Sequence, residues 1–283
     1  INAASRIDDS SLASKLLISN DINEIATVSK KLFLINEKRK LIENKVFHEA
    51  LDQIEKQKNN KFFILYKNSW HHGVLGIVAS KIVSIYNKPT FVISFNNNKG
   101  VGSGRSIDQV DIGSIVLELK NNNLIEEGGG HKMAVGIKLN INKVDSLKKC
   151  LNNKFAIYNN SIFEKILSYD LQLSVNQINS ELLNIIEQME PYGKGNEEPQ
   201  FLIKDIMVEK IKVLKNKHIL IFFKNDLGSN LRGISFNCID TQLGDYISKH
   251  NLYKFDFLCS IKRDNFSNND LPQIQIIDAK VIN

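Results

Sequence analysis

Three consecutive glycines followed by a histidine constrain this chain more than any other feature. The glycines occupy residues 128–130, His131 follows them, and residues 133–135 are apolar. Glycine loses more backbone freedom on folding than any other residue, so such a run usually marks a sharp bend or a close approach. Successive glycine N–H groups can form a concave anion site, and a histidine can donate to an oxyanion. Because the apolar residues predict a strand entering a core, we predict a phosphate or phosphodiester site here rather than a plain surface loop.

A second glycine cluster, KGVGSGRS, occupies residues 99–106. Its Arg105 offers a planar fork of donors that suits phosphate, and Ser103 and Ser106 add hydroxyl groups. We interpret the segment as a Gly-flanked turn that binds phosphate; a Gly-rich hairpin turn with a solvated arginine is the alternative. The segment lacks the Gly-Lys-Ser/Thr ending of a Walker loop and the glycine spacing of a dinucleotide-binding fingerprint.

Length and composition indicate a globular chain of about two domains. The 283 residues are 42% hydrophobic, with a formal net charge of +6. A basic balance of this size permits a nucleic-acid partner without requiring one. The cysteines Cys150, Cys238 and Cys259 are far apart and predict free thiols in a reducing compartment. No apolar run predicts a membrane span, and the start at Ile1 suggests an incomplete chain.

Helical and strand patterns alternate up to about residue 160, which predicts an α/β domain. Strands are predicted over residues 62–66 and 90–95, and helices over residues 74–86, 111–120 and 144–155. A long helix that starts near Asp21 precedes them. Its single apolar stripe consists of Ile25, Val28, Leu32, Ile35, Ile42, Val46 and Ala50. We interpret it as a helix that connects two domains.

The chain from about residue 162 onward changes to short strand-like runs, which predicts a small barrel of the OB type. Such barrels usually bind single-stranded nucleic acid. The basic residues expected to line a groove on it are Lys204, Lys210, Lys212, Lys215, Lys217, Arg232 and Arg263. For any one lysine, an ordinary solvated position at a sheet edge is the simpler interpretation.

The histidines do not predict a metal site. His71 and His72 are adjacent, and adjacent residues of a helix point in different directions, so they make a poor chelating pair. A position at a helix N-terminus facing an anion suits them better. No Asp and His cluster with metal-ligand spacing occurs in the sequence.

Five segments match the motifs of one family, in that family's order. They are INAASR (residues 1–6), WHHGVLGIVAS (70–80), GSGRS (102–106), GGHKMAVG (129–136) and EPYGKGNEEP (190–199). Together they resemble the RecJ family of bacterial single-strand-specific exonucleases over nearly the whole chain. Ser5 departs from that family's Asn-Ala-Ala-Gly-Arg, and residues 264–269 replace an expected Trp-containing strand motif.

The resemblance implies an α/β DHH-associated domain, preceded by a long linker helix and followed by a β-barrel OB-like domain. We expect the end of a DHH domain and the connecting helix at 1–58, the DHH-associated domain at 59–158 and the OB-like domain at 159–283. The family's metal-binding Asp and His residues, including an Asp-His-His motif, belong to an N-terminal DHH domain. No Asp-His-His occurs here, so we expect Mn²⁺ or Mg²⁺ in the full-length enzyme and none bound by this chain alone.

The implied activity is metal-dependent 5′→3′ hydrolysis of single-stranded DNA, used in cytoplasmic DNA recombination and repair, with no membrane partner. By resemblance, the residues that bind the 5′-terminal phosphate are Arg6, Ser103, Arg105 and Ser106. Those that face the scissile phosphate are Gly129, Gly130 and His131, of which His131 is the candidate catalytic residue. Single-strand-binding protein or a helicase are expected partners.

Three other functions remain open at this point. A smaller DHH-family phosphoesterase for oligonucleotides would share the glycine-histidine cluster but lacks a counterpart of the segment after residue 162. A non-catalytic single-strand-binding module would bind DNA with a steep salt dependence, whereas a protein-interaction scaffold would not. The chain alone is predicted to be inactive as a nuclease.

Overall fold

A computed structural model describes residues 1–223, 231–264 and 271–282 of the chain. The chain divides into two compact units, residues 1–165 and residues 166–283. Each unit is described by itself below. Of the segment 264–269, in which the sequence departs from the family motif, only Asp264 lies within the described residues.

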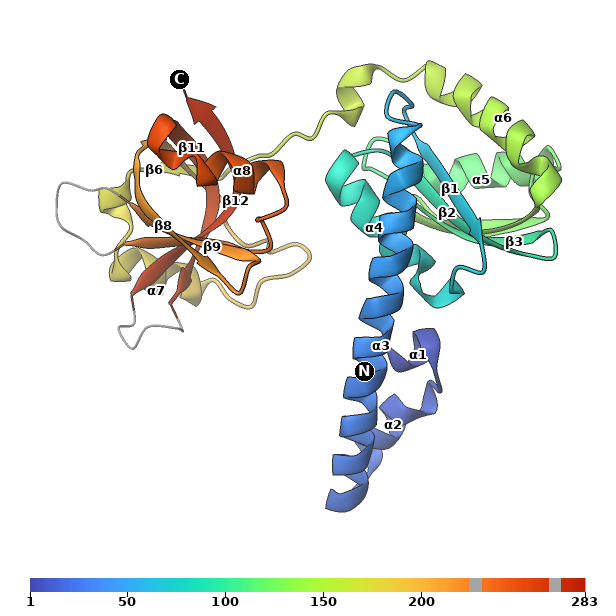
Figure 1. The fold of residues 1–283 in the computed structure, drawn as a ribbon, viewed down its shortest axis with the longest axis horizontal. Helices are drawn as coiled ribbons and strands as arrows, with labels where there is room; N and C mark the ends of the chain where they lie inside the picture. Colours follow the sequence, from blue (N-terminus) through green and yellow to red (C-terminus); the bar gives the residue numbers. More distant parts are fainter. Residues whose placement is uncertain (224–230, 265–270, 283) are drawn as a thin grey trace. The chain divides into compact units, whose positions relative to one another are not determined.

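The first unit is organised along one long helix, α3 (Ile22–Glu55), which confirms the helix predicted from Asp21. Asp21 caps it by accepting a hydrogen bond from the backbone N–H of Asn23. The N-terminal half of α3 packs against α1 (Ala4–Ile7) and α2 (Ser11–Ile18), as Figure 1 shows. Its C-terminal half buries Val46, Phe47 and Ala50 against the sheet side of the unit. One apolar stripe therefore joins two separate packing surfaces.

A five-stranded sheet with the order β1-β2-β3-β5-β4 forms the centre of this unit. Its strands are β1 (Phe63–Asn68), β2 (Thr90–Asn96), β3 (Lys99–Arg105), β4 (Glu127–His131) and β5 (Ala134–Asn140). The β1 and β2 strands are parallel and are connected through α4 (His72–Tyr86), whereas the other pairs are antiparallel.

Helices cover both faces of this sheet, as the α/β prediction requires. The α3 and α4 helices share a buried cluster with Phe63, Leu65 and Val92 on one face. On the other face, α5 (Ile112–Asn121) and α6 (Val144–Ala156) pack on side chains that include Phe91 and Ile93. The one contiguous sheet thus separates two apolar layers (Figure 1).

The predicted turn around Arg105 is wrong, because residues 99–105 form the central strand β3. Gly100, Gly102 and Gly104 alternate along it and face the α5–α6 side. A Cβ on any of them would lie 2.5–2.8 Å from the side chains of Phe95, Ile93 or Val135. The alternating glycines therefore make room for large neighbours within a sheet. Residues 128–130 likewise lie in a strand, β4, which pairs with β5 at the edge of the sheet.

The second unit contains one seven-stranded sheet with the order β6-β7-β11-β12-β10-β9-β8. Its strands are β6 (Leu171–Leu173), β7 (Phe201–Ile206), β8 (Val208–Leu214), β9 (His218–Phe223), β10 (Arg232–Ser235), β11 (Lys254–Arg263) and β12 (Pro272–Ile282). The order of pairing ends at β6 and β8, so the described strands form an open sheet and not the closed barrel that the sequence predicted.

Two helices accompany this sheet. The first helix, α7 (Ser180–Gln188), buries Leu183 and Ile186 in the core of the unit. The second helix, α8 (Gln242–Ser248), was not predicted. Its Gly244 approaches the carbonyl oxygen of Cys238 so closely that a Cβ would lie 2.0 Å away. None of the helices in the described part of the chain combines the length and apolarity needed to cross a membrane.

The segment between the units stays attached to the first unit as far as Glu164. Phe163 joins the core of the first unit. The side-chain amide of Asn87 donates to the carbonyl oxygens of Ile162, at 3.4 Å, and Glu164, at 2.9 Å. Ile166, in contrast, is 83% exposed. The compact units meet at residues 165 and 166, whereas the sequence places the boundary between residues 155 and 162.

We expect limited digestion with a broad-specificity protease to cut the chain first within residues 165–168. The reason is that residues 160–164 are held by the core and by Asn87, and proteases need a segment that can leave the fold. Mass spectrometry of the first fragments measures the position. A first cut within residues 155–162 would support the boundary predicted from sequence instead.

Candidate functional site

The two glycine-rich clusters meet on one face of the first sheet. Arg105 on β3 pairs with Ala134 on β5, and Ala134 pairs with His131 on β4. Paired residues lie on the same face of a sheet, so Arg105 and His131 share one row. Their backbones are two strands apart, which is roughly 10 Å. Ser103, Gly136 and Gly129 form the neighbouring row on the same face.

Backbone hydrogen bonds hold the ends of the two clusters together. The N–H of Ser106 donates to the carbonyl oxygen of Met133 at 3.0 Å, and the N–H of Ile112 donates to that of Lys132 at 3.1 Å. Ser106 itself is buried, and its hydroxyl donates to the carbonyl oxygen of Val110 at 2.7 Å. The structure therefore gives Ser106 a role in holding the segment after β3, and its hydroxyl proton is already engaged.

Arg105 is half-buried against the first turns of α4. Its Nη1 donates to Ser103 Oγ and to the carbonyl oxygen of Gly104, both at 2.8 Å. Gly76 of α4 leaves room for the guanidinium, because a Cβ there would lie 2.8 Å from Nη2. Packing on a glycine and bonding to Ser103 fix the orientation of this arginine.

Arg6 reaches the same part of α4 from α1. Its Nη1 donates to the carbonyl oxygen of Gly73 at 3.4 Å. The backbone of Arg6 lies directly on Gly73, where a Cβ would be 1.8 Å from the Arg6 carbonyl oxygen. Burial, together with the positive charge of Arg6, lowers the pKa of Arg105 from its usual value. Two guanidinium groups thus act on each other across a glycine face of α4.

Neither of these arginines has a carboxylate partner among the ion pairs of the described residues. The other arginines do: Arg39 pairs with Glu43, Arg232 with Asp264 and Arg263 with Glu187. Like charges that are partly removed from water cost free energy unless an anion joins them. The arrangement of Arg6 and Arg105 is therefore suited to an anionic ligand.

The glycines of β4 and β5 differ in why the fold needs them. Gly130 has a φ of +147°, and a Cβ on it would lie 2.2 Å from the carbonyl oxygen of Ala134. Gly129 and Gly136 have open space where a Cβ would stand. They form part of the lining of a cavity of about 400 Å³, together with Lys120 and Lys138. No atom of the described residues would meet a Cβ at these two positions, so a ligand that approaches the backbone closely would explain the glycines.

The predicted histidines occupy different positions around this face. His131 ends β4 and is exposed. His71 caps α4, its Nδ1 accepting a hydrogen bond from the N–H of Gly73 at 3.2 Å. No group of three or more His, Cys, Asp or Glu side chains in the described residues could hold a metal ion. The described residues on this face do not form a ligand set for a metal ion, whereas they can bind and orient an anion.

The second unit presents basic and aromatic side chains on the β8–β9–β10 part of its sheet. Lys210 pairs with Phe222, which pairs with Arg232 on its other side. On the same face, Lys212 pairs with Leu220. Phe236, just after β10, is 45% exposed. We call this set of side chains the β8–β10 surface. Sequence reasoning identified its cations but missed Phe222, because only strand pairing places this ring beside them.

The seven predicted groove residues do not form one groove. Lys210, Lys212, Lys215 and Lys217 all belong to the β8–β9 hairpin. Arg263 instead bonds to Glu187 of α7 through two nitrogens, at 2.9 and 2.5 Å. Lys204 lies on β7, beside a separate cavity that Asp256 and Asp278 also line. The four lysines of the β8–β9 hairpin are therefore separate from Arg263, which is ion-paired, and from Lys204, which lies on another strand.

Comparison with known domain families identifies both units. The DHHA1 domain family matches residues 59–156, and the family described as the RecJ OB domain matches residues 169–278. The chain thus contains a DHHA1 domain followed by an OB domain, as the sequence predicted.

Relatives extend this similarity to the whole chain. The single-stranded-DNA-specific exonuclease RecJ of Bacillus subtilis is 28% identical over 99% of this chain and 36% of its own length. RecJ of Haemophilus influenzae is 29% identical over 86% of this chain and 44% of its own length. A solved structure of RecJ from Thermus thermophilus in complex with Mn²⁺ has the same fold, with a TM-score of 0.77 and 23% identity over 100% of this chain and 40% of that one.

The two matched domains and their order describe what kind of chain this is. The chain combines a DHHA1 domain with a RecJ OB domain that follows it. Over most of its length the chain is similar to RecJ proteins, and it spans less than half the length of the curated relatives it matches.

Two alanine variants test the distinction between the glycines. We expect Gly130→Ala to lower the free energy of unfolding by about 2 kcal/mol or more, because the φ is unfavourable and the Cβ overlaps a carbonyl oxygen. Gly129→Ala, its matched control on the same strand, should leave stability unchanged or raise it by about 0.5 kcal/mol. Urea unfolding of both variants measures this. Equal destabilisation would show that Gly129 also serves the fold.

Proposed function

We propose that this chain is the substrate-binding portion of a single-stranded-DNA-specific 5′→3′ exonuclease that acts in DNA recombination and repair. The observation that carries the proposal is the pair Arg6 and Arg105, which lies beside open glycine backbone and lacks a carboxylate. The similarity to RecJ proteins, which are named for this activity, supports it.

The charge of the arginine pair favours a terminal phosphate over an internal one. A phosphate monoester carries about −1.5 to −2 near pH 7, whereas an internal phosphodiester carries a single negative charge. Two guanidinium groups together match the monoester. Arg105 is held rigidly by Ser103 and Gly76, and such a preorganised fork suits bidentate contact with phosphate oxygens. Recognition of this end would impose the 5′→3′ direction.

The open face of β4 and β5 is the path that we assign to the following phosphodiester. Gly129 and Gly136 let a strand come close to the sheet, and His131 lies in the same row as Arg105. An exposed histidine there can donate a hydrogen bond to a phosphate oxygen. Gly130 keeps the end of β4 in the shape that presents His131. His131 is accordingly proposed as the residue that contacts the scissile phosphate.

Hydrolysis itself needs groups that the described residues lack. Activation of water by divalent metals requires carboxylate or histidine ligands, and the described part of the chain holds no such cluster. We assign the Mn²⁺ or Mg²⁺ ions to a DHH domain that these 283 residues do not include. The role left to this chain is to hold the 5′ end and the strand behind it.

The β8–β10 surface is our candidate for gripping the rest of the strand. Aromatic rings accept the face of any base, and flanking cations attract the backbone, so binding of this kind tolerates all sequences. Phe222 lies beside Lys210, and Lys212 follows on the same face, whereas Arg232 on the other side of Phe222 is ion-paired with Asp264. Further partners, single-strand-binding protein or a helicase, and a cytoplasmic location without membrane contact follow from the same proposal.

The chain alone should bind single-stranded DNA and leave it intact. We expect a 5′-phosphorylated oligonucleotide to bind with an affinity that falls steeply with salt, and no nucleotide to be released in Mn²⁺. Fluorescence anisotropy and gel analysis of the same samples measure both. Weak, salt-independent binding would favour a protein-interaction scaffold. Metal-dependent release that His131→Ala abolishes would show that the chain holds its own metals.

Arg105→Lys tests recognition of the terminal phosphate. Lysine keeps the charge but loses the planar fork, so binding of a 5′-phosphorylated strand should weaken by roughly 1.5–3 kcal/mol. The loss should shrink on the same strand with a 5′-hydroxyl, and titration of both strands by wild type and variant measures it. Lys99→Arg, at the other end of β3, is the control that should change neither affinity. An equal loss on both strands would reduce Arg105 to a general backbone contact.

A further inference from the structure

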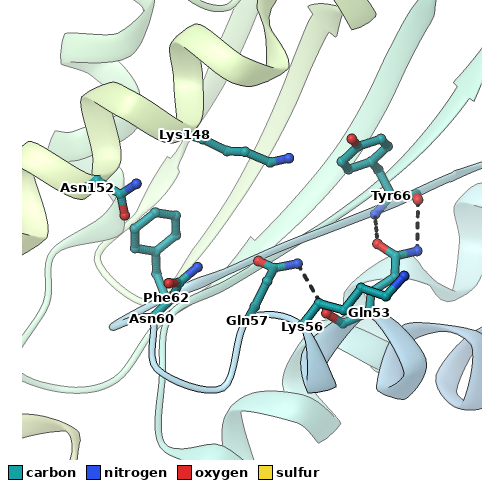
Figure 2. Close-up of a pocket in the computed structure, with 8 residues that line it drawn as sticks. All are labelled: Gln53, Lys56, Gln57, Asn60, Phe62, Tyr66, Lys148 and Asn152. Carbon is teal, nitrogen blue, oxygen red and sulfur yellow. Dashed lines mark hydrogen bonds between the residues drawn. The ribbon is translucent and has the colours of Figure 1, made fainter.

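A cavity apart from the arginine pair lies at the β1 edge of the first sheet, opposite the β4 edge that carries His131. It has a volume of about 500 Å³ and lies between the end of α3, the start of β1 and α6. Figure 2 shows Lys148 and Asn152 of α6 on one side of it, with Phe62 and Tyr66 and the end of α3 opposite them.

Two glutamines of the α3 end close the edge of β1 beside this cavity. The amide of Gln53 accepts from the N–H of Tyr66 at 3.0 Å and donates to the carbonyl oxygen of Tyr66 at 2.9 Å. Gln57 makes the same pair of bonds to Ile64, at 3.3 and 3.1 Å. These side chains take the place of a neighbouring strand, so the edge is satisfied. The cavity is therefore not an unpaired strand edge, and the two bonded glutamine side chains form a fixed part of its wall.

The charge of the lining is positive. Lys56 and Lys148 are the lysines that line it, and no lining residue, all of them within the described part of the chain, carries a carboxylate. Lys148 lies 3.8 Å from Asp145, whose side chain is 91% exposed, and such a surface pair contributes little. The ammonium of Lys148 also lies 5.1 Å from the centre of the Tyr66 ring. The cavity is therefore suited to an anion with a planar part.

The remaining lining groups can recognise the edge of a heterocycle. Asn60 and Asn152 each carry a donor and an acceptor on one side chain, and they approach from a loop and from a helix respectively. The ring of Tyr66 supplies a partly exposed aromatic wall. A volume of about 500 Å³ falls within the range of small-molecule sites.

We propose that this cavity is a second nucleotide site, separate from the strand path on the other face of the sheet. Lys148 and Lys56 hold the phosphate, Asn60 and Asn152 bond to the base, and Tyr66 stacks against it. The nucleotide is either a free mononucleotide or one residue of a longer strand. The inference does not rest on the proposed function, because no residue of the cavity belongs to the Arg6–Arg105 surface.

The test follows the side-chain amide signals of Asn60 and Asn152 by NMR while the complete chain is titrated with deoxythymidine 5′-monophosphate. We expect saturable shifts at both amides. Lys148→Ala and Asn152→Asp, read at the remaining Asn60 amide in the second case, should weaken the dissociation constant at least tenfold. Their neighbours on α6, Lys149→Ala and Asn153→Asp, are matched controls that should change it less than twofold.

Further titrations identify the ligand and distinguish this cavity from the site at Arg6 and Arg105. The shifts should persist in Arg105→Lys, so failure of the terminal-phosphate proposal would leave this one standing. If only an unphosphorylated oligonucleotide produces them, the occupant is a nucleotide within a strand. The proposal is overturned if neither probe shifts these amides, if inorganic phosphate does so with equal affinity, or if the control variants weaken binding as much as Lys148→Ala and Asn152→Asp.

Discussion

The contact between the α1 backbone and Gly73 of α4 is the constraint on which the candidate site depends. Only a glycine admits the Arg6 carbonyl oxygen, since a Cβ would lie 1.8 Å from it. One turn further along α4, Gly76 admits the guanidinium of Arg105. Residues three apart share a helix face, so these two glycines bring together groups that are 99 positions apart in the sequence. Arg6 and Arg105 can therefore approach each other because α4 carries glycines, and no side chains, at Gly73 and Gly76.

Glycine serves three different purposes in this sheet, and each has its own physical signature. Gly100, Gly102 and Gly104 make room for side chains of the core, since a Cβ on any of them would collide with a neighbour. Gly130 adopts a backbone conformation that other residues avoid. At Gly129 a Cβ would meet no neighbour and the φ is not positive, so neither explanation applies. Glycine in the interior of a strand lowers its stability. A position that lowers stability without a cause inside the fold is best explained by what it binds.

The sequence predicted the elements whose pattern is local. The stripe on α3 and the apolar runs of β1 and β2 were sufficient, because period and composition alone specify them. It failed at β3, whose alternating glycines resemble a turn until the side chains of the adjacent strands are known. Closure of the second sheet was also predicted wrongly, because strand order depends on pairing between distant segments.

The candidate site was predictable in its residues but not in its arrangement. Arg105 and His131 were named from motifs that resemble a family, whereas their position on one face requires the register of β3, β5 and β4. Arg6, named in the same way, is placed by the contact of α1 with Gly73. Ser106 has a hydroxyl suited to phosphate, yet the fold uses that hydroxyl on Val110. Phe222 gave no signal, because a partly exposed aromatic residue in a strand looks like any core residue in a sequence.

Under the proposed function, the two units would solve different recognition problems, and the construction of each suits its part. An end of a strand is a single chemical group, so its recognition requires donors fixed in direction; Arg105 is fixed by a strand, by Ser103 and by a glycine helix face. The body of a strand varies at every base, so its recognition requires surfaces that accept any base. Phe222, with Lys210 and Lys212 on the same face, offers a ring and charges without a set of directed donors for base edges. The first unit would therefore determine the 5′→3′ direction, and the second unit would bind the strand whatever its base sequence.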